Sequence, residues 1–389
     1  MALHTIQELK IRQALPLDVK IRMTEQRIRE FVSEFGVDGC YLSFSGGKDS
    51  TALMHIARSI YPDLPAVFVD TGLEYPEIRD FVKTFENVEW LKPKMNFKQV
   101  INKYGYPFIS KEVSECVYGA RKYLKELERD GIIPEHSTAQ HSTAIIINSE
   151  SYVQLMNFLQ KRMKNREGGS NRRLLIMLGE LEMMRNFPEK RKSRFNQAKY
   201  KFLLDAPFEI SNLCCNVMKK APAHEYHRRT GRNPIIATMA EESQLRTQKW
   251  IQHGCNAFDA KIPTSKPLSF WRNQDVLKYL KENHIEICSV YGKIVEDFEA
   301  VDQMENQITI NDVLGEKNDL PLKTTGCERT GCMFCGFGCH LNNDQRFVRM
   351  KETHPKQYDY IMRSADQGGL NYKEIIEWLN EHGDLHIQI

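Results

Sequence analysis

The chain has 389 residues, of which 41% are hydrophobic and 27% charged, and its formal net charge is +3. This composition is typical of a globular protein with two average domains or one large α/β domain with insertions, and it excludes a chain that is basic throughout. No apolar run approaches the ~20 residues of a membrane span and the start lacks the apolar core of a signal peptide, so we expect a cytoplasmic protein with no membrane contact.

Strands and helices alternate along the first ninety residues. The hydrophobic pattern predicts a helix over 23–35, buried strands over 40–44 and 64–70, a helix over 76–85 and a strand over 88–91. This spacing is typical of an α/β fold with a doubly wound, mostly parallel sheet, which is the fold class we expect.

The turn after the first strand carries the strongest functional signal. It reads Ser-Gly-Gly-Lys-Asp-Ser and is followed by a helical pattern that runs to residue 60. A glycine-rich turn at a helix start points backbone N–H groups and the positive end of the helix dipole at an anion, and glycine permits φ > 0. An ordinary polar turn is the alternative. We expect a nucleotide phosphate to bind here, with Lys48 and Asp49 as candidate catalytic residues among Ser45, Gly46, Gly47, Lys48, Asp49 and Ser50.

A second polar loop, Asp70-Thr71-Gly72, follows the next strand. Because the carboxyl ends of parallel strands share a sheet edge, we expect both loops to form one cofactor-binding pocket. Asp70 is a candidate catalytic residue that would receive a ribose hydroxyl, an amino group or Mg²⁺ through water. A turn or helix-capping role is the alternative.

Residues 110–205 interrupt the alternation and predict a mainly helical insertion. Between Ser151 and Lys201 there are 13 Lys and Arg against 4 Asp and Glu, with aromatic residues interleaved. Such segments suit DNA or RNA, whereas a solvated helical face is the alternative. The residues expected to contact a polyanion are Lys190, Arg191, Lys192 and Arg194.

The α/β pattern resumes with a strand over 234–238, followed by a charged helix start. Glu242 and Arg246 would lie near the same sheet edge, and Arg is suited to binding anions. A helix start that is simply charged gives the same pattern. We expect both residues to bind the nucleotide.

Six of the ten cysteines cluster in the sequence: Cys214, Cys215, Cys327, Cys332, Cys335 and Cys339. In a cytosolic enzyme this indicates metal or redox chemistry. Four thiolates suit a [4Fe–4S] cluster or zinc, and free thiols are a further alternative. Adjacent cysteines crowd one tetrahedral ion, so we favour the cluster. The choice of four ligands among six stays open. The four isolated cysteines should be small buried hydrophobic residues: Cys40, Cys116, Cys255 and Cys288.

Together these segments resemble the iron–sulfur-containing branch of the phosphoadenylyl-sulfate (PAPS) reductase family, within the PP-loop ATP pyrophosphatase superfamily. The matching pieces, in the family's order, are SGGKDS at 45–50, VDTGLEYPE at 69–77, CCNVMKKAP at 214–222, AEESQLR at 240–246, PLSFWRNQDVLKYL at 267–280 and GCMFC at 331–335. The resemblance implies an adenine nucleotide alpha hydrolase-like fold and a basic pair, Lys219 and Lys220, that faces the substrate. It places the cluster ligands at Cys214, Cys215, Cys332 and Cys335.

Two departures separate the chain from sulfonucleotide reductases. No cysteine follows Cys339, whereas reductases use a nucleophilic cysteine in a Glu-Cys-Gly-x-His tail. The family's Gly-x-Arg before the Glu-Ser motif is Ala237-Thr238-Met239 here, which lacks an arginine. The chain is more similar to members used in nucleic-acid sulfur modification, which cleave ATP between the α and β phosphates.

We therefore expect an enzyme that binds ATP or a related adenine nucleotide, with Mg²⁺, and releases pyrophosphate for sulfur transfer. A sulfur donor protein is a further expected partner. The alternatives are a PAPS or adenylyl-sulfate reductase and a non-catalytic nucleotide- or nucleic-acid-binding component. The expected organisation is an N-terminal helix with the first part of the PP-loop domain at 1–109, the basic insertion at 110–205, the rest of the α/β domain at 206–325, and the cysteine loop with C-terminal helices at 326–389.

Overall fold

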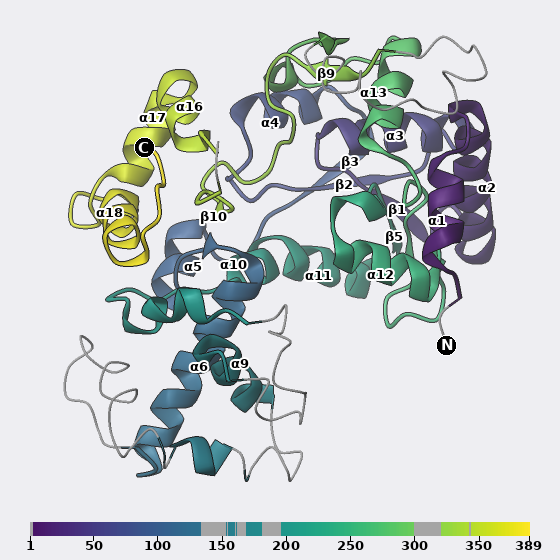
Figure 1. Ribbon diagram of the computed structural model, residues 1–389. Helices are drawn as coiled ribbons and strands as arrows, with labels where there is room; N and C mark the ends of the chain where they lie inside the picture. Colours follow the sequence, from purple (N-terminus) through teal and green to yellow (C-terminus); the bar gives the residue numbers. More distant parts are fainter. Residues whose placement is uncertain are drawn as a thin grey trace. The chain divides into compact units, whose positions relative to one another are not determined.

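The computed structural model describes residues 3–133, 153, 155–159, 161, 169–180, 196–298, 320–341 and 344–389 (Figure 1). The chain divides into two compact units. The first comprises Met1–Lys94 and Lys219–Met333, and the second comprises Met95–Met218 and Phe334–Ile389. The four-part division expected from the sequence stays a prediction. In the described ranges, no helix combines the length and the apolar character needed to cross a membrane.

A six-stranded sheet forms the centre of the first unit (Figure 1). Its strands, in spatial order, are β3 (Val88–Leu91), β2 (Ala66–Val69), β1 (Cys40–Ser43), β5 (Asn233–Ile236), β7 (Thr264–Ser265) and β6 (Asn256–Ala257). Every neighbouring pair is parallel except β6 with β7. The chain runs outward from β1 through β2 to β3 and later resumes on the other side of β1 with β5. This arrangement confirms the predicted α/β fold with a mostly parallel sheet.

Helices cover both faces of this sheet. Cys40 and Leu42 belong to the main hydrophobic core, whereas Tyr41 and Val67 face the opposite side and pack with Tyr226. Successive residues of a strand point to opposite faces, and burial of both faces is typical of parallel sheets. On the core side α3 packs against α2 and α13. The helices of this unit are α1 (Ile6–Gln13), α2 (Leu17–Phe35), α3 (Lys48–Ile60), α4 (Pro76–Lys83), α11 (Ala221–Thr230), α12 (Gln244–His253) and α13 (Asn273–Glu282).

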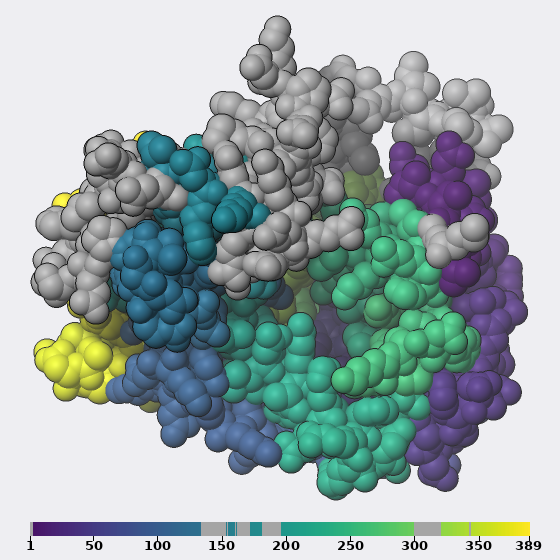
Figure 2. All heavy atoms as spheres, turned by 90° about the horizontal axis from the view of Figure 1, so that it is seen from below, coloured from purple at the N-terminus to yellow at the C-terminus, as the bar shows by residue number. Residues whose placement is uncertain are grey.

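The helix predicted over 23–35 begins earlier, at Leu17. The hydrophobic pattern did not indicate this earlier start, because it counts Lys20 as exposed. In the structure the Lys20 side chain is buried and its Nζ lies 2.7 Å from Asp275 Oδ2. A paired lysine can occupy an interior position that a hydrophobic pattern would exclude. Figure 2 shows the purple N-terminal segment adjoining the green surface of this unit. The His4 ring stacks on Trp250, with ring centroids 4.7 Å apart.

Short elements complete the first unit. Two 3₁₀ turns, η3 (Ala240–Glu242) and η4 (Ser289–Tyr291), follow the sheet strands in the chain. An antiparallel pair joins β8 (Ile294–Glu296) to β9 (Leu322–Thr324). These turns bring side chains from distant parts of the sequence to one sheet edge.

The second unit is mostly helical. α6 packs against α9 and η1, and the parallel strands β4 and β10 pair with each other. Its elements are α5 (Phe97–Tyr104), β4 (Phe108–Ile109), α6 (Lys111–Arg129), α9 (Gly169–Leu178), η1 (Ala198–Asp205), α10 (Leu213–Cys215), which a π-helical turn (Asn216–Lys220) continues, β10 (Gly336–Phe337), α16 (Arg346–Thr353), α17 (Pro355–Met362) and α18 (Tyr372–Gly383). The residues expected to contact a polyanion lie outside the described residues: Lys190, Arg191, Lys192 and Arg194.

Candidate functional site

The turn between β1 and α3 is braced by its own serines. The Oγ atoms of Ser45 and Ser50 lie 3.0 Å apart, and Ser50 Oγ donates to the carbonyl of Gly47 at 2.8 Å. Gly46 has φ +69, as predicted for a glycine in the left-handed region. Gly47 differs from the prediction, because its φ of −79 is ordinary extended backbone. The bracing fixes the turn at the amino end of α3, where a helix favours anions.

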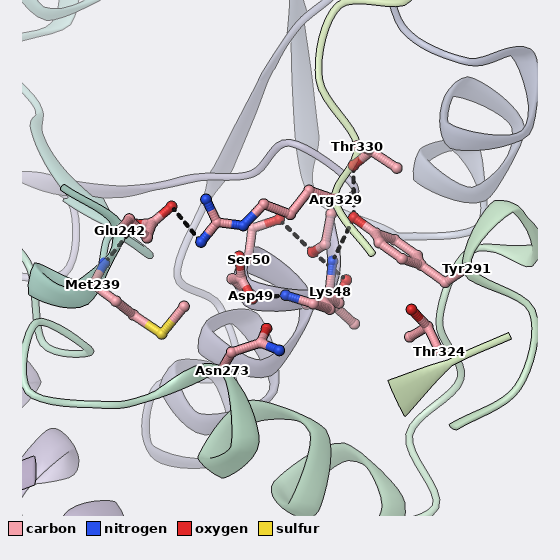
Figure 3. Close-up of polar contacts among 12 residues, drawn as sticks. Lys48, Asp49, Ser50, Met239, Glu242, Asn273, Tyr291, Thr324, Arg329 and Thr330 are labelled. Atoms are coloured by element: carbon pink, nitrogen blue, oxygen red, sulfur yellow. Dashed lines mark hydrogen bonds and ion pairs between the residues drawn. The ribbon is translucent and has the colours of Figure 1, made fainter. Parts of the chain in front are cut away.

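Lys48 is buried and paired at this turn. Its Nζ lies 2.7 Å from Asp49 Oδ1, and its side chain is 2% exposed against 24% for Asp49. The backbone N–H of Lys48 donates to the Tyr291 hydroxyl at 3.2 Å, and this hydroxyl also lies 2.6 Å from Thr330 Oγ1 (Figure 3). Burial raises the pKa of Tyr291 to about 12, so its hydroxyl keeps its proton near neutral pH.

A cavity of about 320 Å³ opens beside the turn. Its lining combines three cationic side chains with two carboxylates, so it carries an excess of positive charge. The residues that line it, all in the first unit, are Ser43, Ser45, Gly47, Lys48, Asp49, Ser50, Ile236, Ala237, Thr238, Glu242, Arg246, Tyr291, Arg329 and Thr330. Of the residues predicted from the sequence, those of the loop at 45–50 except Gly46 line this cavity together with Glu242 and Arg246.

Glu242 organises the side of the cavity that follows β5. Its Oε2 accepts the backbone N–H of Met239 at 2.8 Å, and the same carboxylate forms an ion pair with Arg246. Its Oε1 lies 3.7 Å from Arg329 Nη2 (Figure 3). Burial lowers the pKa of Arg246, and repulsion from Arg329 lowers it further. The Glu242 carboxylate therefore interacts with two guanidinium groups, those of Arg246 and Arg329.

The loop after β2 does not line this cavity, although we expected it to complete the pocket. Asp70 accepts hydrogen bonds from Arg79 at 2.8 Å and from the N–H of Gly72 at 3.2 Å. Thr71 Oγ1 donates to Glu74 at 2.7 Å. Asp70, Thr71 and Gly72 are absent from the lining of the 320 Å³ cavity. The loop satisfies its own polar groups, and a role for it in binding stays a prediction.

The strand order explains why the second wall comes from β5. Ligands of open α/β sheets bind where the order of strands reverses, at the carboxyl ends of the strands. Here the reversal lies between β1 and β5, so Ser43 and Ile236, the last residues of these strands, both line the cavity. The linear sequence gives the strands but not the side of β1 on which each one lies.

Seven of the fourteen lining residues were not among the predicted site residues. Four of them belong to the ends of β1 and β5 or the turn after β5, and the other three come from segments with no predicted nucleotide contact: Tyr291, Arg329 and Thr330. Tyr291 stands in a 3₁₀ turn that has no motif. Arg329 and Thr330 lie between Cys327 and Cys332. The sequence analysis interpreted this segment as metal-binding because of its cysteines. A guanidinium and a hydroxyl in a glycine-containing loop were the available signal, since both are common anion ligands.

Comparison with known proteins places the chain in a family. Residues 39–131 and 171–336 match the phosphoadenosine phosphosulfate reductase domain. The chain belongs to this family. The matched ranges include β1, the turn at 45–50 and β5.

Two similar proteins give the extent of the likeness. An uncharacterized protein of Methanocaldococcus jannaschii is 38% identical over 97 residues, which are 22% of this chain and 23% of that protein. The chain thus spans less than a quarter of the length of this curated relative. A crystal structure of PAPS reductase from Candida auris in complex with phosphate covers 74% of this chain and 87% of its own, at 13% identity and a TM-score of 0.32.

The cysteines expected to bind a cluster divide between the two units of this PAPS reductase-family chain. Cys214, Cys215 and Cys335 belong to the second unit, and Cys332 belongs to the first. Electrostatic interactions connect Cys335 with Cys215, and Tyr372 with both Cys214 and Cys335. Within the described ranges, no group of three or more His, Cys, Asp or Glu side chains is arranged to hold a metal ion.

The remaining cysteines are buried. Cys339 is 2% exposed, and burial raises its pKa to about 12. Cys327 is buried in the first unit, where it interacts with Cys288. The prediction that the isolated cysteines are buried is confirmed for Cys40, Cys116, Cys255 and Cys288. Lys219 and Lys220, which the resemblance placed against the substrate, are exposed and do not line the cavity.

Proposed function

We propose that this PAPS reductase-family chain binds ATP in the cavity beside α3 and cleaves it between the α and β phosphates. The products are pyrophosphate and an adenylated target, which sulfur then attacks. The observation that carries this proposal is the braced turn at 45–50, which presents the amino end of α3 and the buried Lys48 to a cavity of about 320 Å³. Fixed donors in a water-poor site stabilise the charge that develops on transferring phosphoryl groups.

The residues of the loop divide this work. Backbone N–H groups at the start of α3 and the Lys48 ammonium would hold phosphate oxygens. Asp49 pairs with Lys48 at 2.7 Å and is partly exposed in the cavity, which supports it as the carboxylate that would hold Mg²⁺ through oxygen. Magnesium bound there would neutralise charge on the phosphates. Asp70 stays a predicted catalytic residue, and its contact with Arg79 would have to open for that role.

Family membership also favours a second reaction, the reduction of PAPS or adenylyl sulfate. That chemistry needs a thiolate that attacks the sulfate sulfur, forms an S–S bond and expels the nucleotide phosphate. Residues 340–389 contain no cysteine, and Cys339 is 2% exposed with a raised pKa. A buried neutral thiol is a poor nucleophile, so these observations support ATP cleavage over reduction.

Anaerobically purified protein should release pyrophosphate from ATP when supplied with a suitable acceptor, and should release negligible sulfite from PAPS or adenylyl sulfate with thioredoxin and a reductant. Pyrophosphate and sulfite are measured in parallel, with tRNA and duplex DNA as candidate acceptors. Strong sulfite release that Cys339→Ser abolishes would establish the reductase alternative. Nucleotide binding without either product would support the non-catalytic alternative.

We propose further that Cys214, Cys215, Cys332 and Cys335 hold a [4Fe–4S] cluster. The donor set supports this, because four thiolates are the ligands of such clusters. Cys335 interacts electrostatically with both Cys215 and Cys339, so the choice of these four ligands among the six cysteines is part of the proposal. When bound, the cluster would supply a structural or sulfur-handling centre, and the chain's part is to provide the thiolates.

Anaerobic protein should therefore contain about four irons and about four sulfides per chain, as this cluster type requires. Cys335→Ser should lose most of the iron, because a cluster rarely survives the loss of one of four ligands. Cys116→Ser is the control, since Cys116 is a buried cysteine of the same unit that stands outside the cluster of six and should retain the iron. Colourless protein with one zinc per chain would contradict the cluster.

The remaining partners stay predictions. The excess of Lys and Arg between Ser151 and Lys201 supports binding to DNA or RNA. If the adenylated target is a nucleic acid, these positive charges would bind its phosphate backbone. A sulfur donor protein follows from the proposed chemistry, because ATP cleavage alone supplies no sulfur.

A further inference from the structure

The cavity has one positive charge more than its own carboxylates neutralise. Lys48 pairs with Asp49 at 2.7 Å, which leaves Glu242 as the carboxylate for both Arg246 and Arg329. The Arg329 guanidinium is 3.7 Å from Glu242, beyond hydrogen-bonding distance, and its side chain is 55% exposed. Its N–H donors therefore remain available to a ligand that enters the cavity.

Arg246 and Arg329 also repel each other. This repulsion contributes to the lowered pKa of Arg246. Two guanidinium groups that line one cavity and share the Glu242 carboxylate leave an excess of positive charge there. An anionic group between them would relieve the repulsion and accept hydrogen bonds from both.

The backbone on both sides of Arg329 is fixed to the cavity wall. On one side the N–H of Cys327 donates to the carbonyl of Val290 at 2.9 Å, and the N–H of Gly326 donates to the carbonyl of Tyr291 at 2.9 Å. On the other side Thr330 Oγ1 lies 2.6 Å from the Tyr291 hydroxyl, which itself accepts the N–H of Lys48. Arg329 is thus presented by a segment anchored to the phosphate-binding turn, so little ordering is needed on binding.

The turn after β5 supplies no cation of its own before Arg246. Ala237 and Thr238 line the cavity there and are uncharged. In Figure 3 the Arg329 side chain extends from the segment between the cysteines toward Glu242, on the β5 side of the cavity. The second cation on this side, besides Arg246, therefore comes from a segment more than eighty positions away in the sequence.

We propose that Arg329, together with Arg246, binds the phosphate chain of ATP, opposite the phosphate contacts of the turn at 45–50. The inference rests on the proposed function for the identity of the nucleotide. It makes Arg329 a specificity-determining residue, because it recognises the anionic chain of the ligand and leaves the adenosine to other contacts.

The test is the nucleotide affinity of Arg329→Gln, measured by calorimetry with ATP, PAPS and adenosine as probes. Loss of one charge-assisted contact should weaken ATP binding about ten-fold or more. Adenosine affinity should be unchanged. Arg329→Lys should fall between Arg329→Gln and the natural protein, because lysine keeps the charge and loses the bidentate geometry. The loss should shrink as salt is raised, because Arg329 is half exposed.

Arg228→Gln is the matched control, because Arg228 is an exposed arginine of the same unit outside the cavity lining, and its ATP affinity should match the natural protein. Thermal unfolding of each variant shows whether the fold is kept.

Each other outcome overturns the inference. An equal loss for adenosine and ATP would make Arg329 a residue that only shapes the cavity. A loss confined to PAPS would assign it to another substrate. Normal ATP affinity in Arg329→Gln, with weakened affinity in Lys48→Ala, would remove this inference and leave the proposed function standing. A natural protein that does not bind ATP at all would remove both.

Discussion

Replacing Lys48 by alanine should weaken ATP binding by about 1.5–3 kcal/mol, or about ten-fold to more than a hundred-fold, the range of a hydrogen bond to a charged group. The side chain is 2% exposed, and its Nζ is fixed 2.7 Å from Asp49 in the cavity wall. Its removal takes away a phosphate contact and also leaves the Asp49 carboxylate unneutralised. A bare carboxylate beside a phosphate adds repulsion, so the loss should lie toward the upper end of the range.

The two contributions can be separated. In the double variant Lys48→Ala/Asp49→Asn the repulsion is gone, so part of the affinity should return, and the remaining deficit measures the lost ammonium. Lys122→Ala is the matched control, an exposed lysine on α6 of the second unit. Calorimetric titration with ATP measures the affinity of the natural protein, the single variant, the double variant and the control. Equal affinity in the natural protein and Lys48→Ala would remove Lys48 from the site and with it the main support for the proposed function.

Local features of the sequence predicted the sheet and the glycine-rich turn at 45–50. The strand over 88–91 has the predicted bounds, and the strand at 40–44 differs by one residue, because a short apolar run between turns has few alternatives inside an α/β pattern. The turn at 45–50 was recognisable because glycine, lysine and hydroxyl residues in this order serve one chemical purpose. Both signals lie within a few consecutive residues.

Contacts between distant residues were beyond the sequence. Tyr291 is 243 positions from Lys48, and neither residue carries a mark of the 3.2 Å hydrogen bond between them. Asp70 has the features of a ligand-binding residue, but its carboxylate accepts a hydrogen bond from Arg79, which lies in the first turn of α4. The partner that a polar side chain finds depends on strand order and on helix packing. Strand order and helix packing depend on the whole fold. A polar residue at a strand end therefore predicts that the residue lies at an edge of the sheet, but it does not predict the partner of its side chain.

Gly46→Ala should destabilise the first unit by about 2–5 kcal/mol, from about 1–2 for a side chain at positive φ and about 1–3 for overpacking. Gly46 has φ +69, and an added Cβ would lie 2.8 Å from Val82 Cγ2 and 2.9 Å from Ile78 Cγ2. Both side chains are buried on α4, so they have little room to yield. The turn would have to move away from α4, and this movement would shift the N–H groups that face the cavity.

Gly231→Ala separates the two costs. Gly231 lies in the same unit with φ +73, and an added Cβ there would meet nothing within 4 Å. This control should therefore show the backbone cost alone, about 1–2 kcal/mol, and normal ATP affinity. Urea unfolding followed by circular dichroism measures both variants. If Gly46→Ala is no less stable than Gly231→Ala, α4 does not confine the turn. The phosphate-binding geometry would then have to be maintained by the serine hydrogen bonds and the Tyr291 hydroxyl, without support from the helix behind it.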